Sequence, residues 1–262
     1  MPKFKGPVDV DYLKKAGEIF APIKQISYKK MQIKQGDTVL DLGCGPGVDA
    51  IELGKLVSPD GLVIGVDYDE AMLAEALEQV ETLKMSRIVG FQQGDAGSLA
   101  FADNYFDSCR SERLFMHLKN PEQVIGEVRR VTKPGGSVVI IDTDWASLSI
   151  DCQSVKIERL LSNYRLEKLI PNSYSGRSLY RLFSRAYFSD IQIDVFPLYT
   201  NDLELFYTLS LQESVENKAL SDNIITQKEL EQWRMELKQA ALENSFYCSV
   251  NIIMVSGIKP FS

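Results

Sequence analysis

The sequence predicts an α/β fold in which a mostly parallel β-sheet is covered by helices on both faces. Two observations support this prediction. Between residues 38 and 142, short apolar runs alternate with longer segments whose apolar residues recur at helical spacing, a pattern typical of right-handed strand–helix–strand units. The run Val-Val-Ile-Ile at 138–141 is apolar at every position, as expected for a central strand with both faces buried.

The elements of the first half can be assigned in order along the chain. Apolar side chains at helical spacing in 8–30 predict one or two helices ahead of the first strand. Asn120, as a capping amide, and Pro121, at the first helical position, begin the helix that precedes the fifth strand. The strands are expected at 38–42, 62–66, 87–92, 105–110 and 137–142, and the earlier helices at 48–57 and 70–85.

After residue 144 the alternation becomes less regular. Helices are expected at 153–168, 179–187, 203–216 and 227–243, and strands at 191–199 and 246–258. We expect the two late strands to complete the same sheet, and the helices around 203–243 to form part of a lid.

Composition and charge exclude several classes of protein. The length of 262 residues suits one large α/β domain, and a net charge of −7 argues against a broad basic surface for nucleic acid. The chain lacks the apolar run of roughly 20 residues that spans a bilayer, and residues 1–6 lack a signal core. The four cysteines are widely spaced and there is one histidine, so no metal site is expected. We expect a cytoplasmic protein with reduced thiols and no membrane or nucleic-acid partner, either a monomer or a homodimer.

The most informative stretch is Val-Leu-Asp-Leu-Gly-Cys-Gly-Pro-Gly at 39–47. A hydrophobic strand leads into a glycine-rich turn and then a helix, and glycines allow a ligand to approach main-chain N–H groups closely. The spacing is G-x-G-x-G, whereas the dinucleotide fingerprint is G-x-G-x-x-G, and no Gly-Lys-Ser/Thr of a P-loop follows. Asp41 is a poor neighbour for a pyrophosphate, but it suits a ligand with a cationic ammonium and a sulfonium.

Together with later segments, this stretch resembles the class I S-adenosylmethionine-dependent methyltransferases. The second strand ends in an acid, Asp67, which would accept hydrogen bonds from ribose hydroxyls as the acid of dinucleotide folds does. The resemblance places Asp95 at the adenine amino group. It also implies that Ala96 supplies its backbone N–H as a hydrogen-bond donor. Phe-Asp at 106–107 and Arg-Val-Thr-Lys-Pro-Gly-Gly at 130–136 also match, so five segments occur in the family's order.

The resemblance implies a Rossmann-like, doubly wound sheet, mostly parallel with an antiparallel last strand, together with a helical cap. It is nearest to the small-molecule branch that includes the ubiquinone/menaquinone-biosynthesis type enzymes. We expect a single methyltransferase domain with N-terminal helices (1–36), a cofactor-binding core (37–145), and a segment (146–262) that completes the sheet and carries the inserted lid.

S-adenosyl-L-methionine is the cofactor that the resemblance implies. Asp41 could instead stabilise its turn, Cys44 could be a packing residue of the loop, and Asp67 could be a charge for the following helix, a role that Asp69 already suits. The residues expected to contact the cofactor are Asp41, Gly43, Cys44, Gly45, Gly47, Asp67, Tyr68, Met72, Gly94, Asp95, Ala96, Ser111 and Arg113.

Candidate catalytic residues follow the fourth and fifth strands, at the edge where open α/β sheets bind ligands. His117, Glu112 and Asp142 are candidate general bases, in that order. His117 could instead be packed near the cofactor, and Glu112 could pair with Arg113. Relatives often carry an acid directly before the histidine, where this chain has Met116, so no role is transferred to that position.

The expected reaction is methyl transfer to a small-molecule acceptor by in-line displacement. Alignment of the reactants can supply about 7–11 kcal/mol, and a base is needed only for a hydroxyl or an acidic carbon. The absence of Asn-Pro-Pro-Tyr after the fourth strand disfavours methylation of a nucleic-acid base or a glutamine amide. Two alternatives stay open: an NAD-dependent Rossmann oxidoreductase, which Asp41 and the loop spacing disfavour, and a non-catalytic module that binds S-adenosylmethionine.

Overall fold

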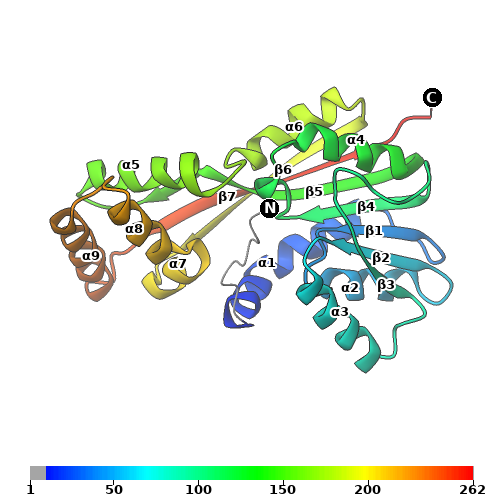
Figure 1. Cartoon of the computed structure of the whole chain (residues 1–262), viewed down its shortest axis with the longest axis horizontal. Helices are drawn as coiled ribbons and strands as arrows, with labels where there is room; N and C mark the ends of the chain where they lie inside the picture. The colour runs from blue at the N-terminus through cyan, green and yellow to red at the C-terminus, as the bar shows by residue number, and fades with distance from the viewer. Residues whose placement is uncertain (1–9, 262) are drawn as a thin grey trace. The chain divides into compact units, whose positions relative to one another are not determined.

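The computed structural model describes the backbone of residues 10–261, and the side chains of residue 17 and of 19–261. Strands and helices alternate through the first half, as predicted (Figure 1). The elements are α1 (Val10–Lys30), β1 (Thr38–Leu42), α2 (Val48–Val57), β2 (Leu62–Asp67), α3 (Glu70–Thr82), β3 (Val89–Gln93), β4 (Phe106–Glu112), the 3-10 turn η1 (Phe115–His117), α4 (Pro121–Val131), β5 (Thr132–Ile150), α5 (Val155–Tyr164), the π-helical turn η2 (Arg165–Leu169), α6 (Ser175–Arg185), β6 (Ser189–Thr200), α7 (Leu203–Ser210), α8 (Gln212–Ser221), α9 (Gln227–Leu242) and β7 (Cys248–Ile258).

The strands form one seven-stranded sheet in the order β3-β2-β1-β4-β5-β7-β6. The first five strands are parallel to their neighbours. β7 is antiparallel to β5, since Lys259 exchanges backbone hydrogen bonds with Gly135 and Gly136 at the start of β5. The predicted α/β sheet, mostly parallel with an antiparallel last strand, is therefore confirmed. The strand order reverses between β1 and β4, which is the point where open α/β sheets bind ligands.

The chain divides into two compact units. The sheet unit comprises Ile26–Trp145, Ile170–Phe196 and Asn251–Phe261. The helical unit comprises Val10–Gln25, Ala146–Leu169 and Pro197–Val250. The helices around 203–243, expected to belong to a lid, are in the helical unit.

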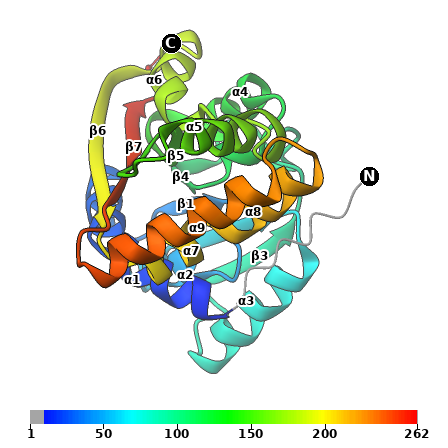
Figure 2. The same ribbon diagram turned by 90° about the vertical axis from the view of Figure 1, so that its left-hand side faces the viewer.

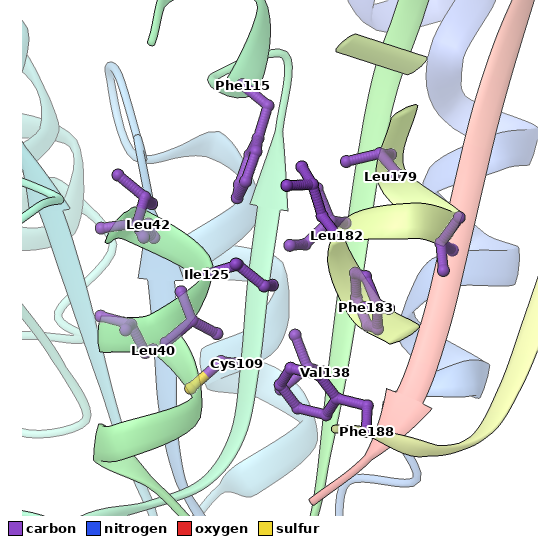
Figure 3. Close-up of a cluster of buried hydrophobic side chains, with 14 of the residues drawn as sticks. Leu40, Leu42, Cys109, Phe115, Ile125, Val138, Leu179, Leu182, Phe183 and Phe188 are labelled. Atoms are coloured by element: carbon purple, nitrogen blue, oxygen red, sulfur yellow. The ribbon is translucent and has the colours of Figure 1, made fainter. Parts of the chain in front are cut away.

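An apolar cluster lies on one face of the sheet unit, beneath α4 and α6 (Figure 3). Leu40 and Leu42 of β1 point into it together with Cys109 of β4 and Val138 of β5. Because side chains alternate between the two faces of a strand, Asp41 points to the opposite face, toward α1 and α2. The apolar cluster thus determines which face of the sheet carries the polar residues described below.

A buried carboxylate joins three helices of the helical unit. Helices α7, α8 and α9 pack together (Figures 1 and 2). Glu216 of α8 is fully buried and accepts hydrogen bonds from the Tyr207 hydroxyl (2.7 Å), the Trp233 indole N–H (2.8 Å) and the Arg234 guanidinium (2.7 Å). These bonds compensate the cost of burying the charge, so the network links three helices.

Several local predictions differ from the structure. The helix expected at 203–216 is broken at Leu211, which adopts φ 50° and separates α7 from α8. β5 is longer than the expected 137–142, since it begins at Thr132, directly after α4, and continues to Ile150. Asn120 does precede Pro121 at the start of α4, but its side chain makes no capping bond within the described residues.

Candidate functional site

The glycine-rich loop between β1 and α2 is held in a shape that requires glycine. Gly43, Gly45 and Gly47 all have positive φ, at 76°, 51° and 80°. At Gly47 a Cβ atom would also lie 2.6 Å from the Phe91 ring. Because of this tight packing, the loop backbone lies close to the sheet at the point where the strand order reverses.

Asp67 connects this loop to the ends of the neighbouring strands. Its Oδ2 accepts a hydrogen bond from the Gly45 N–H at 2.8 Å, and its backbone carbonyl accepts from the Gly94 N–H at 3.0 Å. The start of α3 is capped by Asp69, whose carboxylate accepts from the Ala71 and Met72 N–H groups. The structure therefore brings Gly45, Asp67 and Gly94 together and assigns the helix-capping role to Asp69.

The other residues expected at the adenosine end lie on the same edge of the sheet. Asp95 is exposed after β3, and its carboxylate accepts from the Gly97 N–H at 2.8 Å, which stabilises its own turn. Ala96 is half-buried beside it. Tyr68 has 69% of its surface exposed directly after Asp67, and Met72 is half-buried on the first turn of α3.

A buried arginine, Arg110 of β4, lies on the same face as Asp41. The two residues are paired in register on adjacent strands, and the Arg110 Nη1 atom is 3.8 Å from the Asp41 carboxylate. The same Nη1 is 3.3 Å from Asp49 of α2, and Nη2 donates to Glu112. The Nε–H donates to the Ser27 hydroxyl of α1 at 3.0 Å. Arg110 thus joins four elements around the glycine-rich loop.

The charges around Arg110 shift its pKa and that of Tyr28. Burial lowers the pKa of the Arg110 guanidinium, but Asp49, Glu112 and Asp41 together outweigh burial and raise it above its ordinary value. The Tyr28 ring lies 5.3 Å from the guanidinium and its hydroxyl donates to Asp49. Burial and then the Asp49 charge raise the pKa of Tyr28, so this phenol stays neutral.

Sequence reasoning missed Arg110, Asp49 and Ser27. The one signal available was the polar character of β4, which reads Phe-Asp-Ser-Cys-Arg-Ser-Glu although most of it is buried. Arg110 and Ser27 are 83 residues apart, so their contact could not be anticipated from local pattern.

Cys44 and Ser111, both expected at the cofactor, are buried. Burial, followed by the charges of Asp41 and Asp67, raises the pKa of the Cys44 thiol well above its ordinary value. The thiol is therefore neutral and is not a nucleophile.

The turn η1, which carries His117, is held from two sides. Asp142 of β5 accepts from the Met116 N–H at 2.8 Å and from the Thr143 N–H at 2.7 Å. On the other side, the Asn172 N–H donates to the Met116 carbonyl at 3.0 Å. Burial raises the pKa of Asp142 to about 7, although the two backbone bonds act in the opposite direction.

The three candidate bases differ in exposure. Asp142 has 0% of its surface exposed, and the Glu112 side chain has 6%. Glu112 pairs with Arg110 and lies 3.7 Å from Arg113, so the predicted alternative of a Glu112–Arg113 pair is found. His117 is exposed, and desolvation by the surrounding protein, followed by the Arg113 charge, lowers its pKa. His117 is thus the candidate base that a ligand can reach directly.

Arg113 itself is unusual in its backbone. It adopts φ 55°, which is rare for a residue other than glycine, and its N–H donates to the Ile141 carbonyl at 2.9 Å. Further along the same edge, Arg177 of α6 binds the buried Asp144 with two contacts of 2.9 Å, and Trp145 is half-buried next to it.

Within residues 10–261, no group of three or more His, Cys, Asp or Glu side chains is arranged to hold a metal ion. In the same part of the chain, no helix has the length and apolar character needed to cross a membrane.

Comparison with known proteins identifies the family. Residues 33–193 match the family model described as methyltransferase domain. An uncharacterized 37.1 kDa protein in transposon Tn4556 of Streptomyces fradiae is 35% identical over 178 residues, which cover 67% of this chain and 51% of that protein. Demethylmenaquinone methyltransferase of Lactobacillus johnsonii is 37% identical over 116 residues, which cover 44% of this chain and 48% of that enzyme.

The solved structures agree on the fold. The YcgJ protein of Bacillus subtilis superposes with a TM-score of 0.67 at 20% identity, covering 92% of this chain and 100% of that one. The chain spans about half the length of the two relatives named above. The family model, however, matches more than half of the chain. The chain therefore belongs to the methyltransferase-domain family.

Proposed function

We propose that the protein is an S-adenosylmethionine-dependent methyltransferase that acts on a small-molecule acceptor. The observation that carries this proposal is the junction of the glycine-rich loop with Asp67 at the strand-order reversal, where Gly45 donates to the Asp67 carboxylate. The site fits the cofactor chemically, because positive-φ glycines allow close approach of a ligand and acidic side chains surround the loop. Membership in the family and the named methyltransferase among its relatives support the same activity.

Each end of the cofactor has candidate residues. Asp67 accepts hydrogen bonds from the ribose hydroxyls, and the exposed Tyr68 ring lies next to it. Gly94, Asp95 and Ala96 contact the adenine.

The amino-acid end lies against the remaining residues of the site. The backbone of the glycine-rich loop runs along this end of the cofactor at Gly43, Cys44, Gly45 and Gly47. Asp41 faces the ammonium of the cofactor. Ser111 and Arg113 border the same end from the loop after β4. When bound, S-adenosylmethionine supplies an electrophilic methyl group on a sulfonium.

His117 is the residue that removes a proton from the acceptor. This exposed residue lies on η1, and its lowered pKa keeps the imidazole neutral near physiological pH. Asp142 holds η1 through the Met116 N–H and is therefore a positioning residue. Glu112 is also a positioning residue, because it acts through its ion pairs with Arg110 and Arg113. The acceptor on this proposal carries an ionisable hydroxyl or an acidic carbon.

We place the protein in the cytoplasm. Its four cysteines lie within the described residues and all four are free thiols, which supports a reducing compartment.

The test begins with ligand binding. Isothermal titration of S-adenosylmethionine, S-adenosylhomocysteine and NAD(H) should give binding of the two sulfur ligands alone. Asp67→Ala should remove that binding, whereas Asp60→Ala, an exposed acid in the turn after α2, should leave it unchanged. Binding of NAD(H) alone, or of no ligand, would overturn the proposal.

Turnover separates an enzyme from a binding module. Candidate acceptors are screened by release of S-adenosylhomocysteine, and His117→Asn should lower kcat by about 10²–10⁴-fold if proton removal is required. Binding of the cofactor without turnover on any acceptor class would instead favour the non-catalytic module.

A further inference from the structure

The turn η1, which carries His117, depends on other elements for its position. It has three residues and few bonds of its own. The His117 N–H donates to the Leu114 carbonyl at 2.9 Å, and the Leu118 N–H donates to the Phe115 carbonyl at 3.2 Å. Hydrogen bonds of a 3-10 turn have poor geometry, and so short a helical segment is stabilised mainly by tertiary contacts. The contacts between η1 and its surroundings therefore decide where His117 lies.

Asn172, in the loop before α6, makes two of these contacts through its two kinds of N–H donor. The backbone N–H donates to the Met116 carbonyl at 3.0 Å, and the side-chain Nδ2 donates to the Phe115 carbonyl at 2.9 Å. The two carbonyls belong to consecutive residues, so the two bonds fix both the position and the direction of the turn. Asn172 and Phe115 are 57 residues apart in the chain, so their contact exists only in the folded protein.

Asn172 is itself fixed, because α6 begins tightly against β5. The Ser175 N–H donates to the Asn172 carbonyl at 3.1 Å, and the Ser175 hydroxyl donates to the Thr143 carbonyl at 3.2 Å. At Gly176 a Cβ atom would lie 2.8 Å from the backbone nitrogen of Asp144, so no side chain fits between α6 and β5 at this point. The first residues of α6 thus hold Asn172 in a constant position relative to β5.

Asp142 of β5 closes a ring of hydrogen bonds around the turn. Its carboxylate accepts from the Met116 N–H at 2.8 Å and from the Thr143 N–H at 2.7 Å. The ring runs from η1 through Asn172 and Ser175 to β5, and returns to η1 through Asp142. No member of such a ring can move without stretching the bond of another member, so the ring restrains η1 from both sides.

The side chains of η1 divide between the interior and the surface. The Phe115 ring has 0% of its surface exposed and points into the apolar cluster (Figure 3). His117 is exposed on the same turn. Burial of Phe115 attaches the turn to the sheet unit, whereas the backbone bonds of the ring set the direction from which the His117 side chain projects.

We propose that Asn172 is a positioning residue for His117, which holds the imidazole at the ligand-binding edge by bonding the carbonyls of the two preceding residues. The inference rests on the proposed function, since the position of the imidazole affects the rate only if His117 removes a proton from the acceptor. Asn172 itself transfers no proton. Its contribution is alignment, for which a displacement on the order of 1 Å can cost about 10²-fold in rate.

The first experiment observes His117 directly by NMR, without an acceptor. The chain has one histidine, so a pH titration of the imidazole resonances reports on this residue in every variant. Asn172→Ala removes the Nδ2 donor and should raise the pKa of His117 toward its ordinary value, because a released imidazole gains contact with water. Asn120→Ala is the matched control, since Asn120 is exposed close to η1 and its side chain makes no capping bond within the described residues.

The control should titrate as wild type does. An unchanged titration in Asn172→Ala would overturn the inference, and so would an equal change in both variants. If Asn172→Ala does not fold by circular dichroism, Asn172→Ser takes its place, because the serine hydroxyl ends one bond short of the Nδ2 position. An unchanged titration of His117 in that variant would likewise overturn the inference.

The second experiment measures turnover with an acceptor found by release of S-adenosylhomocysteine. Asn172→Ala should lower kcat by about 10- to 100-fold and leave KM for S-adenosylmethionine within about 3-fold of wild type. Asn120→Ala should keep both constants near wild type. A purely structural role predicts instead that cofactor affinity and kcat fall together in Asn172→Ala, and that result would overturn the inference.

Failure of the proposed function has a different signature. Wild type would then release no S-adenosylhomocysteine with any acceptor class, or His117→Asn would retain the wild-type kcat. The NMR titration does not depend on turnover, so a changed titration in Asn172→Ala would still show that Asn172 positions the imidazole.

Discussion

Asp41 of β1 and Arg110 of β4 are paired in register on adjacent parallel strands, and their charged groups lie 3.8 Å apart inside the sheet unit. Paired residues of neighbouring strands project from the same face of a sheet, so the pairing follows from strand register. Leu40 and Leu42 occupy the opposite face, within the apolar cluster. The apolar packing of one face therefore aligns the charged pair on the other.

Substitution of Gly47 by alanine should disrupt the glycine-rich loop. Its φ of 80° is strained for a residue with a side chain, and the new Cβ would lie 2.6 Å from the Phe91 ring. We expect Gly47→Ala to lower the free energy of unfolding by about 1–3 kcal/mol, measured by urea denaturation. Affinity for S-adenosylhomocysteine should fall by about 10-fold or more as the loop backbone shifts.

Gly90→Ala in β3 is the control for this change. A Cβ at Gly90 meets nothing within 4 Å, and its φ is not positive. Stability and affinity should stay near wild type, and an equal effect of the two substitutions would show that the loop does not depend on the conformation of Gly47.

His117 should titrate below the ordinary histidine range. Desolvation, followed by the Arg113 charge, lowers its pKa from 6.5, so the neutral imidazole predominates at physiological pH. The chain has one histidine, so an NMR titration of the imidazole resonances reports on this residue without assignment. In stability terms, a lowered pKa means that the neutral form is favoured in the folded state. The contribution of His117 to stability is present at pH values above its pKa in the unfolded chain. It is lost as the pH falls through its pKa in the folded protein.

Arg113→Gln tests the electrostatic part of that shift. Removing the cation should raise the pKa of His117 only part of the way back, because desolvation is the larger cause. An unchanged titration curve in this variant would remove Arg113 from the explanation.

Asp142 should make the protein less stable as the pH rises, whereas a salt-bridged acid makes a protein more stable as the pH rises. Burial raises its pKa from 3.8 to about 7, so the folded state favours the protonated form. The contribution is fully present below the unfolded pKa and is lost as the pH rises through about 7. A shift of this size corresponds to a contribution on the order of 4 kcal/mol.

Asp142→Asn provides the comparison, because it keeps the shape of the side chain and cannot ionise. Melting temperatures from pH 4 to 8 should show wild type losing stability relative to Asp142→Asn as the pH rises. Parallel curves over the whole range would mean that Asp142 is ionised in the folded protein.

Glu216→Gln should destabilise the helical unit. The buried carboxylate accepts from Tyr207, Trp233 and Arg234, and an amide cannot accept from all three donors while its own N–H groups stay satisfied. We expect a loss of about 2–4 kcal/mol in the free energy of unfolding by urea denaturation. Glu213→Gln, exposed on the same helix, should change stability by less than about 0.5 kcal/mol.

The elements of the sheet unit were predictable because their signals are local. The apolar run 138–141 marks a central strand, and the glycine spacing after β1 marks a ligand loop. Asp69 caps α3 through N–H groups two and three residues away, which is an interaction within one turn. The break at Leu211 was not predictable in this way, since the residues on both sides of it favour a helix and the left-handed conformation of Leu211 has no local sequence signal.

The residues of the candidate site also fall into two groups, those with a local sequence signal and those without one. Asp41, Asp67 and Asp95 stand out in the amino-acid sequence because each lies at the end of an apolar strand or just after it, at the spacing of a ligand-binding edge. The positions of Arg110, Asp49 and Ser27 around one buried charge depend on contacts between three elements far apart in the chain. Strand register and helix packing bring such groups together, and burial then makes their electrostatic interactions strong. Periodicity and spacing describe neighbours along the chain, so they reveal where a ligand edge lies but not which distant side chains control its charge.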